Sequence, residues 1–312
     1  MNIKLEQVTK NYGNVQGISN INLEVNKGIT GILGPNGAGK STTMKIILGL
    51  SRPSRGRVTV DGRNPFDDWE LKKDFGFVPE YDCFYEHMSG LEFVSYFLRM
   101  HDCQKEEAEE RARKALSELG LEDAMERKIN TYSRGMRQKT KVARATVFNP
   151  EVLVMDEPFQ GADPTTRMLL MNKMTEWAED GKTILISSHI LHDIQSLTDN
   201  IALINNGKML AHGNRHEIRN LINVPRPISI VPVNDGNLRK LAKRLLDEKW
   251  TKATSIDEDN NELTVETTQT EDVYLEIPKI LQKEKITVER IYSEDDSLDS
   301  LYAKLVEGHQ WK

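Results

Sequence analysis

The sequence predicts an α/β protein whose core is a parallel sheet, followed by a small α+β unit. A short apolar run at Ile29–Leu33 leads through a glycine-rich loop into a helical pattern. Further unbroken apolar runs occur at Val152–Met155 and Thr183–Ser187. Continuous rather than alternating hydrophobicity is typical of strands buried on both faces of a parallel sheet. After residue 225 the pattern changes to the order β-α-β-β-α-β, which indicates a ferredoxin-like unit.

The segment before the glycine-rich loop is expected to form short antiparallel strands. Apolar residues alternate with polar ones over residues 3–8 and 18–25, and residues 11–14 have the composition of a turn. The loop should lead into a helix over residues 42–50. Two more helices are expected over Ser89–Met100 and Lys105–Leu119, where the second has glutamates spaced to pair with arginines and lysines on a solvated face.

The elements expected beyond residue 225 follow one another closely. They are a strand at 228–233, a helix at 237–249, a hairpin of 251–256 and 262–267 around Asp259–Asn261, a helix that ends near Lys285 with Pro278 in its first turn, a strand at 286–292 and a last helix at 298–306. Most of the excess of acidic over basic residues also lies after residue 225. Such a shift in charge supports a domain boundary there.

The composition is that of an ordinary soluble globular protein and excludes several classes. The 312 residues carry 42 basic and 48 acidic side chains, a formal net charge of −6, which disfavours binding to a nucleic-acid backbone. No apolar stretch approaches the roughly 18 residues that span a bilayer. The first residues lack an apolar signal-peptide core. Cys83 and Cys103 are too few for a disulfide framework, so we expect both to be packing residues in a cytosolic protein.

The glycine-rich loop fits the phosphate-loop pattern G-x-x-x-x-G-K-[ST]. Its glycines let backbone N–H groups converge on phosphate oxygens, and the helix that follows presents free N–H groups and a dipole that attract anions. We expect Lys40 to reach the β- and γ-phosphates and the Ser41 hydroxyl to bind Mg²⁺. The predicted nucleotide site consists of Gly34, Pro35, Asn36, Gly37, Ala38, Gly39, Lys40, Ser41 and Thr42.

The apolar run Val152–Met155 ends in two carboxylates, Asp156 and Glu157. Acids at the carboxyl end of a parallel strand lie where such sheets bind ligands. We expect Asp156 to hold Mg²⁺ through water and Glu157 to orient and polarise an attacking water. A charge pair that merely ends a strand is the alternative interpretation, and the phosphate loop upstream argues against it.

With both motifs present, the chain resembles the ATP-binding cassette (ABC) ATPases, the nucleotide-binding subunits of ABC transporters, over about residues 2–220. The segment Tyr132–Lys139 resembles the family signature, usually Leu-Ser-Gly-Gly-Gln followed by a basic helix, and matches it at Ser133 and Gly135. Three positions depart from it: Tyr132, Arg134 and Met136. The resemblance implies that Ser133 and Gly135 contact the γ-phosphate of an ATP held by another subunit.

Four further residues lie in segments that resemble motifs of this family. Asp163 lies in a Gly-Ala-Asp-Pro sequence like that of the D-loop, and His189 stands at the place of the switch histidine. Tyr12 resembles the aromatic residue that stacks on adenine. Glu80 occupies the place of the usual Q-loop glutamine. Because a carboxylate oxygen also suits Mg²⁺, we expect Glu80 to bind Mg²⁺ or its water.

The resemblance implies a P-loop NTPase of the ABC ATPase type, with a mixed sheet core, an antiparallel β subdomain and a helical subdomain at about residues 84–147. It assigns residues 1–222 to the ATPase domain and 226–312 to an accessory C-terminal domain. ATP and Mg²⁺ are the implied cofactors, with Glu157, His189 and Lys40 as catalytic residues.

The resemblance also implies partners and a location. Each ATP would lie between the phosphate loop of one subunit and the segment 133–135 of the other, so a homodimer is the simplest assembly. A separate membrane permease would complete a transporter, with this chain peripheral on the inner face of the cell membrane. The variant signature and the C-terminal unit resemble those of bacterial drug- or antibiotic-exporter ATPases, which implies export. That unit would bind a regulator, mediate dimerisation or act as a spacer.

Two other classes of function remain as alternatives. Soluble ABC ATPases act on DNA or ribosomes, but chromosome-maintenance types have a long coiled coil before the signature, and no long heptad run separates Lys40 from Tyr132. Translation-factor types usually carry two cassettes in one chain. A nucleotide sensor without catalysis is disfavoured by the complete set of Lys40, Asp156, Glu157 and His189.

Overall fold

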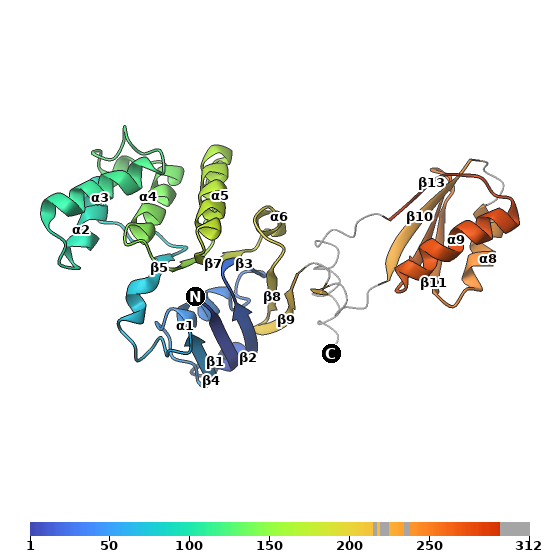
Figure 1. Ribbon diagram of the computed structural model, residues 1–312, viewed down its shortest axis with the longest axis horizontal. Helices are drawn as coiled ribbons and strands as arrows, with labels where there is room; N and C mark the ends of the chain where they lie inside the picture. The colour runs from blue at the N-terminus through green and yellow to red at the C-terminus, as the bar shows by residue number, and fades with distance from the viewer. Residues whose placement is uncertain (215–216, 219–224, 234–237, 294–312) are drawn as a thin grey trace. The chain divides into compact units, whose positions relative to one another are not determined.

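The structure is a computed structural model that describes residues 1–214, 217–218, 225–233 and 238–293 (Figure 1). The chain divides into two compact units, Met1–Arg215 and His216–Lys312. Each unit has a hydrophobic core of its own and is described by itself. The division lies earlier in the chain than the boundary expected near residue 225.

The N-terminal unit contains a six-stranded sheet and a three-stranded antiparallel sheet. Its strands are β1 (Ile3–Tyr12), β2 (Val15–Val25), β3 (Gly28–Leu33), β4 (Arg55–Val60), β5 (Phe75–Val78), β6 (Val152–Met155), β7 (Thr183–Ser188), β8 (Ile201–Asn205) and β9 (Lys208–Gly213). The larger sheet has the order β5-β6-β7-β3-β8-β9, and its neighbours are parallel except for β8 and β9. The smaller sheet has the order β2-β1-β4. The predicted α/β class and the antiparallel N-terminal strands are confirmed.

The central strands of the larger sheet are the continuous apolar runs of the sequence. Every residue of β6 and β7 is buried, as expected for strands covered on both faces. The register pairs Leu33 at the end of β3 with Ser188 in β7, and Met155 at the end of β6 with Ile186. Because these strands are parallel, the loops that follow them emerge at one edge of the sheet.

Helices of the N-terminal unit cover the sheet and extend beyond its β5 edge (Figure 1). They are α1 (Lys40–Ile47), α2 (Gly90–Arg99), α3 (Lys105–Ser117), α4 (Arg134–Thr146), α5 (Pro164–Glu179) and α6 (Leu191–Gln195), with short 3-10 helices η1 (Leu71–Asp74) and η2 (Ile129–Thr131). The first of them begins at Lys40 rather than at the expected residue 42. The reason is Gly39, whose left-handed backbone (φ 107°) ends the loop and starts the helix directly after it.

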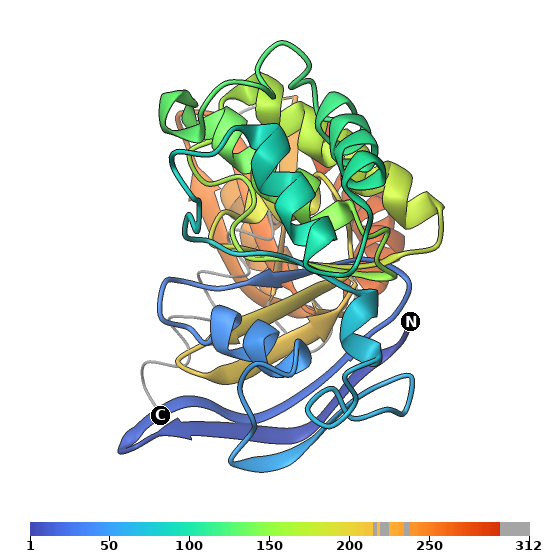
Figure 2. The same cartoon turned by 90° about the vertical axis from the view of Figure 1, so that its left-hand side faces the viewer.

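One hydrophobic core joins the two sheets of this unit. It contains Met44, Ile46 and Ile47 of α1, together with side chains from both sheets such as Leu5 of β1 and Ile32 of β3. The helix α1 therefore lies between the sheets, as Figure 2 shows for the blue helix above the dark-blue strands. This packing fixes the direction in which the N-terminus of α1 points.

The helices α2, α3 and α4 pack against one another within the expected helical subdomain of residues 84–147. A capping box starts α2, in which the Ser89 hydroxyl accepts from Glu92 N and the Glu92 carboxylate accepts from Ser89 N. Buried alanines at Ala108 and Ala112 give α3 a narrow face on which its neighbours can approach closely.

The C-terminal unit contains a four-stranded antiparallel sheet and the helices α8 and α9. Its elements are β10 (Arg226–Pro232), α8 (Leu238–Leu246), β11 (Thr251–Asp257), β12 (Glu262–Thr267), α9 (Thr270–Glu284) and β13 (Val288–Tyr292). The strand order is β11-β12-β10-β13, so the predicted β-α-β-β-α-β order and the hairpin are confirmed. The expected helix at 298–306 lies outside the described residues.

Two expectations about single residues are wrong. Pro278 lies in the interior of α9 rather than in its first turn. A proline there removes one helical hydrogen bond, but Val273, Ile277 and Leu281 are buried on this helix, and their packing favours its continuation. Cys83 is exposed, so it is not a packing residue, whereas Cys103 is half-buried.

Within the described residues, no helix is both long and apolar enough to cross a bilayer.

Candidate functional site

The phosphate loop connects β3 to α1 and is shaped by its glycines. A Cβ on Gly34 would lie 2.2 Å from the Ile204 carbonyl oxygen, so no larger residue fits against β8. Gly37 has a left-handed backbone (φ 79°), and a Cβ there would meet no atom within 4 Å. Pro35, Asn36 and Gly37 are exposed, whereas Ala38 and Lys40 are buried. The exposed residues 35–37 of the loop are therefore accessible to a ligand, as a phosphate-binding loop requires.

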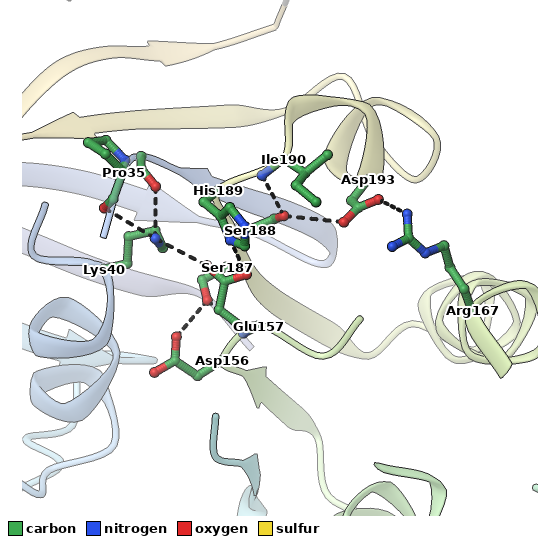
Figure 3. Close-up of polar contacts among 11 residues, drawn as sticks. Pro35, Lys40, Asp156, Glu157, Arg167, Ser187, Ser188, His189, Ile190 and Asp193 are labelled. Atoms are coloured by element: carbon green, nitrogen blue, oxygen red, sulfur yellow. Dashed lines mark hydrogen bonds and ion pairs between the residues drawn. The ribbon is translucent and has the colours of Figure 1, made fainter. Parts of the chain in front are cut away.

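Lys40 lies inside this loop with its side chain only 6% exposed. Its ammonium group donates to the Gly34 carbonyl at 2.8 Å and to the Pro35 carbonyl at 3.3 Å (Figure 3). It also lies 3.1 Å from Oε1 of Glu157. A buried cation is tolerated because these oxygens surround it. Ser41 and Thr42 follow in the first turn of α1, where both are half-buried and no acidic residue opposes an anion.

The carboxylates of Asp156 and Glu157 follow β6, and both residues are buried, at 4% and 7% exposure. Ser187 at the end of β7 joins them. Its hydroxyl donates to Asp156 Oδ1 at 2.6 Å and accepts from the Glu157 N–H at 2.9 Å. The sequence does not single out Ser187, because a serine near a strand end has no distinctive spacing.

Glu157 connects the phosphate loop to His189, the residue expected to be the switch histidine. Its Oε1 faces Lys40, and its Oε2 lies 2.9 Å from Nδ1 of His189 (Figure 3). Lys40 and Glu157 Oε1 form an ion pair without the geometry of a hydrogen bond. This buried oxygen can therefore still accept a hydrogen bond. The His189 side chain is 38% exposed. The structure thus brings the three expected catalytic residues into one cluster.

The expected magnesium ligands come from three elements at the same edge of the sheet. Asp156 follows β6, Glu80 follows the neighbouring strand β5, and Ser41 lies in α1. Hydroxyl and carboxylate oxygens are the hard ligands that Mg²⁺ prefers, so the residue types fit the ion. The Asp156 N–H donates to the Val78 carbonyl at 2.8 Å, which ties the ends of the two strands together. In the described part of the chain, however, no three His, Cys, Asp or Glu side chains form a preorganised metal cluster.

Glu80 is held through its backbone. Lys141 of α4 donates to the Pro79 and Glu80 carbonyls, both at 3.2 Å, and lies 3.3 Å from Asp82. Burial lowers the pKa of Lys141, and the Asp82 carboxylate partly offsets that effect. Among the described residues, none forms a hydrogen bond with the half-buried Glu80 side chain.

The signature and D-loop residues form a second group. Ser133 is the N-cap of α4 and accepts from Met136 N at 3.3 Å, while Asp163 is the N-cap of α5 and accepts from Thr166 N at 2.9 Å. A Cβ on Gly135 would lie 2.7 Å from Asp163 Oδ2, so the first turn of α4 packs closely against the cap of α5. Among the described residues, no hydrogen bond or ion pair joins this group directly to Lys40 or Glu157.

Tyr12 lies at the end of β1 and is 48% exposed. Its hydroxyl is 3.5 Å from the Ser51 hydroxyl, and the Lys10 ammonium lies 5.1 Å from its ring centroid. Burial acts to raise the pKa of Tyr12, but hydrogen bonds to Ser51 and Thr42 and the nearby lysine charges bring it below its usual value. An exposed ring in this position is accessible to a flat ligand.

Residues 18–160 match a family model described as "ABC transporter". The Nod factor export ATP-binding protein I of Cupriavidus metallidurans is 34% identical over 218 residues, which cover 69% of this chain and 72% of that protein. The linearmycin resistance ATP-binding protein LnrL of Bacillus subtilis is 33% identical over 218 residues, or 69% and 70% of the two chains. An uncharacterised ABC transporter ATP-binding protein of Synechocystis is 36% identical, and the match covers 65% of this chain and 58% of that relative.

Solved structures show the same similarity. An ATP-binding subunit of an ABC transporter superposes with a TM-score of 0.63 at 30% identity, covering 70% of this chain and 92% of the other. A dimeric bacterial ABC transporter cassette has a TM-score of 0.63 at 29% identity, with coverage of 68% and 98%. The same kind of cassette in a post-hydrolysis state, bound to ADP and Pi, has a TM-score of 0.61 at 28% identity, with coverage of 68% and 98%.

Proposed function

The chain belongs to the ABC transporter ATP-binding proteins, and on that premise we propose that it hydrolyses ATP at the Lys40–Glu157–His189 cluster to drive export through a separate permease. One observation carries this proposal. Glu157 is held between the lysine of the phosphate loop and the histidine that follows β7, at 3.1 and 2.9 Å. A carboxylate in that place can polarise a water beside the terminal phosphate.

In the proposed reaction, Lys40 changes partners. Its ammonium group donates to two loop carbonyls and pairs with Glu157. When ATP binds, it would instead contact the β- and γ-phosphates. That exchange leaves Oε1 of Glu157 free to accept a proton from the attacking water. His189 would keep the other oxygen oriented and bond the γ-phosphate. Positioning and charge stabilisation of this kind supply most of the catalysis in phosphoryl transfer.

Ser41, Asp156 and Glu80 would hold Mg²⁺, which neutralises charge on the β- and γ-phosphates. Ser187 supports this role by holding one oxygen of Asp156 and leaving the other available. Gly34, Pro35, Asn36, Gly37, Ala38, Gly39 and Thr42 would surround the phosphates, and Tyr12 would stack on adenine.

A second copy of the chain is the proposed partner in the ATP-bound state. The caps Ser133 and Asp163, together with Gly135, would meet the γ-phosphate of the ATP that the second copy holds. The free N–H groups at the start of α4 suit that contact. A similar solved cassette is a dimer, which supports the same assembly here.

The helical subdomain and the segment before it are the proposed docking face for the permease. Exposed aromatic residues occur there at Tyr81 and Tyr85, with Trp69 nearby in the sequence. Docking would place the protein on the inner face of the cell membrane. Export is proposed because similar proteins are named for Nod factor export and linearmycin resistance.

Co-purification with a permease tests the proposal. Membranes from the source organism are solubilised, and the tagged chain is used to recover its membrane partner. We expect ATP hydrolysis by the recovered complex to exceed that of the isolated chain and to disappear with Lys40→Ala. Stimulation by ribosomes or DNA instead, with no membrane protein recovered, would favour the soluble class of ABC ATPase.

A further inference from the structure

A partly buried ion pair lies beside the catalytic cluster and is not part of it. Arg167 in the first turns of α5 donates from Nη1 to Asp193 Oδ1 of α6 at 2.5 Å (Figure 3). The other oxygen of Asp193 accepts from the Ser188 hydroxyl at 3.4 Å. Three elements that are separate in the sequence thus meet at one carboxylate.

Asp193 depends on this pairing because it is only 2% exposed. Burial raises the pKa of Asp193, and the Arg167 charge and the Ser188 hydroxyl oppose that effect. A buried charge is stable only when a partner and hydrogen bonds compensate it. Arg167, one-third exposed and 5.9 Å from the Phe159 ring centroid, is the cation that does so.

Asp193, the carboxylate of the pair, contacts the residue that precedes His189. The Ser188 hydroxyl donates to Asp193 and accepts from the Ile190 N–H at 2.9 Å. His189 lies between Ser188 and Ile190 in the chain. The Ser188 hydroxyl therefore holds the backbone on both sides of the histidine. That backbone carries the imidazole ring whose Nδ1 lies 2.9 Å from Oε2 of Glu157.

The arginine side of the pair leads to the signature group. Thr166, the residue before Arg167, donates from its hydroxyl to Asp163 Oδ2 at 2.8 Å. The space for a Cβ on Gly135 is closed by Asp163 Oδ2 and by Thr166 Oγ1, each at 2.7 Å. The first turn of α5 therefore touches the start of α4 on one side and Asp193 on the other.

We propose that Arg167 and Asp193 are a positioning pair that holds His189 against Glu157 and ties that contact to the first turn of α5. The pair does not touch the reacting atoms. It makes the geometry of the histidine depend on the position of the helix that backs the signature group. This role rests on the proposed ATP hydrolysis at Glu157.

Replacement of the arginine tests the pair in the full-length protein. We expect Arg167→Met to lower kcat for MgATP about 10- to 100-fold, the scale of a small misplacement of catalytic groups, while KM changes less than about twofold. Arg167→Lys should recover part of kcat. Lys173→Met is the matched control, since Lys173 pairs with Glu176 on the same helix at the surface, and should leave kcat unchanged.

A double substitution separates positioning from simple stability. Arg167→Met with Asp193→Asn removes both charges, so the melting temperature should return toward the wild-type value. If the pair positions His189, kcat stays low in this folded variant. Recovery of kcat together with the melting temperature would overturn the proposal and leave a structural role only.

A second comparison uses the histidine itself. In a His189→Ala background, Arg167→Met should cause no further loss of kcat, because both changes remove the same contact. If the loss of kcat in the double variant equals the product of the two single losses, the proposal is contradicted. If the wild-type protein shows no hydrolysis at all, the proposed function fails; normal wild-type hydrolysis with unaltered kcat in Arg167→Met refutes the pair alone.

Discussion

Glu157, two residues after the end of the buried strand β6, adopts a left-handed backbone conformation with φ at 49°. Such a conformation is uncommon for residues other than glycine and is maintained only when surrounding contacts compensate for it. Here the Glu157 N–H donates to Ser187, and the side chain is held by Lys40 and His189. The turn aims the carboxylate back across the sheet edge at the phosphate loop.

The hydroxyl of Ser187 can be removed with little change in volume. We expect Ser187→Ala to reduce kcat about tenfold and to lower the free energy of unfolding by about 1–3 kcal/mol, because the Glu157 N–H and an Asp156 oxygen lose their partner. Steady-state hydrolysis and urea titration measure the two effects. Unchanged values for both would show that this bridge contributes nothing.

The carboxylate of Glu80 offers a test of metal binding. Glu80→Gln should keep turnover within a few-fold of wild type and raise the Mg²⁺ concentration needed for half-maximal activity, since an amide oxygen is a weaker ligand for Mg²⁺ than a carboxylate. Glu107→Gln is the control, because Glu107 pairs with Arg111 at the surface of α3, away from this segment. A titration curve that coincides with that of the wild type would exclude Glu80 from the metal site.

Some functional residues can be predicted from neighbouring residues in the sequence, and others only from the tertiary structure. Lys40 and Glu157 belong to short patterns whose chemistry can be predicted from neighbouring residues. Arg167 and Asp193 are 26 residues apart, and their contact exists only because α5 and α6 pack near β7. Tertiary pairing of this kind leaves no periodic or spaced pattern in a single sequence.

At the scale of elements, α4 connects the signature to the strand before the Q-loop. Its basic residues line one side: Arg137 reaches Glu86, Lys141 reaches the Glu80 carbonyl, and Arg144 donates to the Phe77 carbonyl at 2.6 Å. The sequence predicted a basic helix after the signature, but it did not show that these cations bind β5 and the segment that follows. The helix thereby holds the Q-loop and the signature at a fixed spacing.

The bidentate contact of Arg137 with Glu86 gives this connection a pH dependence. Its two hydrogen bonds, both 2.7 Å, hold the pKa of Glu86 below its usual value. A carboxylate with a lowered pKa in the folded state stabilises the protein above its unfolded pKa of about 4.3, and that contribution is lost as the pH falls through the folded value.

We therefore expect Glu86→Gln to lower the urea midpoint at neutral pH and to converge with the wild type in acid. The difference between the two midpoints, measured from pH 7 to pH 3, should shrink as the pH falls below the ordinary glutamate pKa. Glu107→Gln, in an exposed pair with Arg111 on α3, should show little effect at any pH. A difference that stays constant with pH would contradict the assigned contact.

At the scale of the whole molecule, the protein consists of two units with separate cores. The N-terminal core surrounds α1 and contains no residue of the C-terminal core, which gathers around Ile230, Trp250 and Leu281. The sequence predicted this separation from a shift in charge and in the order of elements. It could not predict Pro278 in mid-helix, because local rules disfavour it and only packing compensates.

Separate cores predict two unfolding transitions, of which only one responds to nucleotide. A ligand at 100 times its Kd stabilises the unit that binds it by about 2.7 kcal/mol. MgATP should therefore raise the midpoint of one calorimetric transition by several degrees and leave the other in place. Lys40→Ala should abolish this shift. A single transition that moves as a whole would refute the independence of the two units.

In the proposed reaction, Glu157 activates the water that attacks ATP between two copies of the chain. The most direct measurement combines ATP hydrolysis with the molecular mass of Glu157→Gln in MgATP, determined by light scattering after gel filtration. We expect the variant to bind ATP, to accumulate as a dimer and to hydrolyse at least about 100-fold more slowly than wild type. Lys40→Ala, as control, should remain monomeric and bind no nucleotide. Near-normal hydrolysis by Glu157→Gln would show that Glu157 does not activate the water.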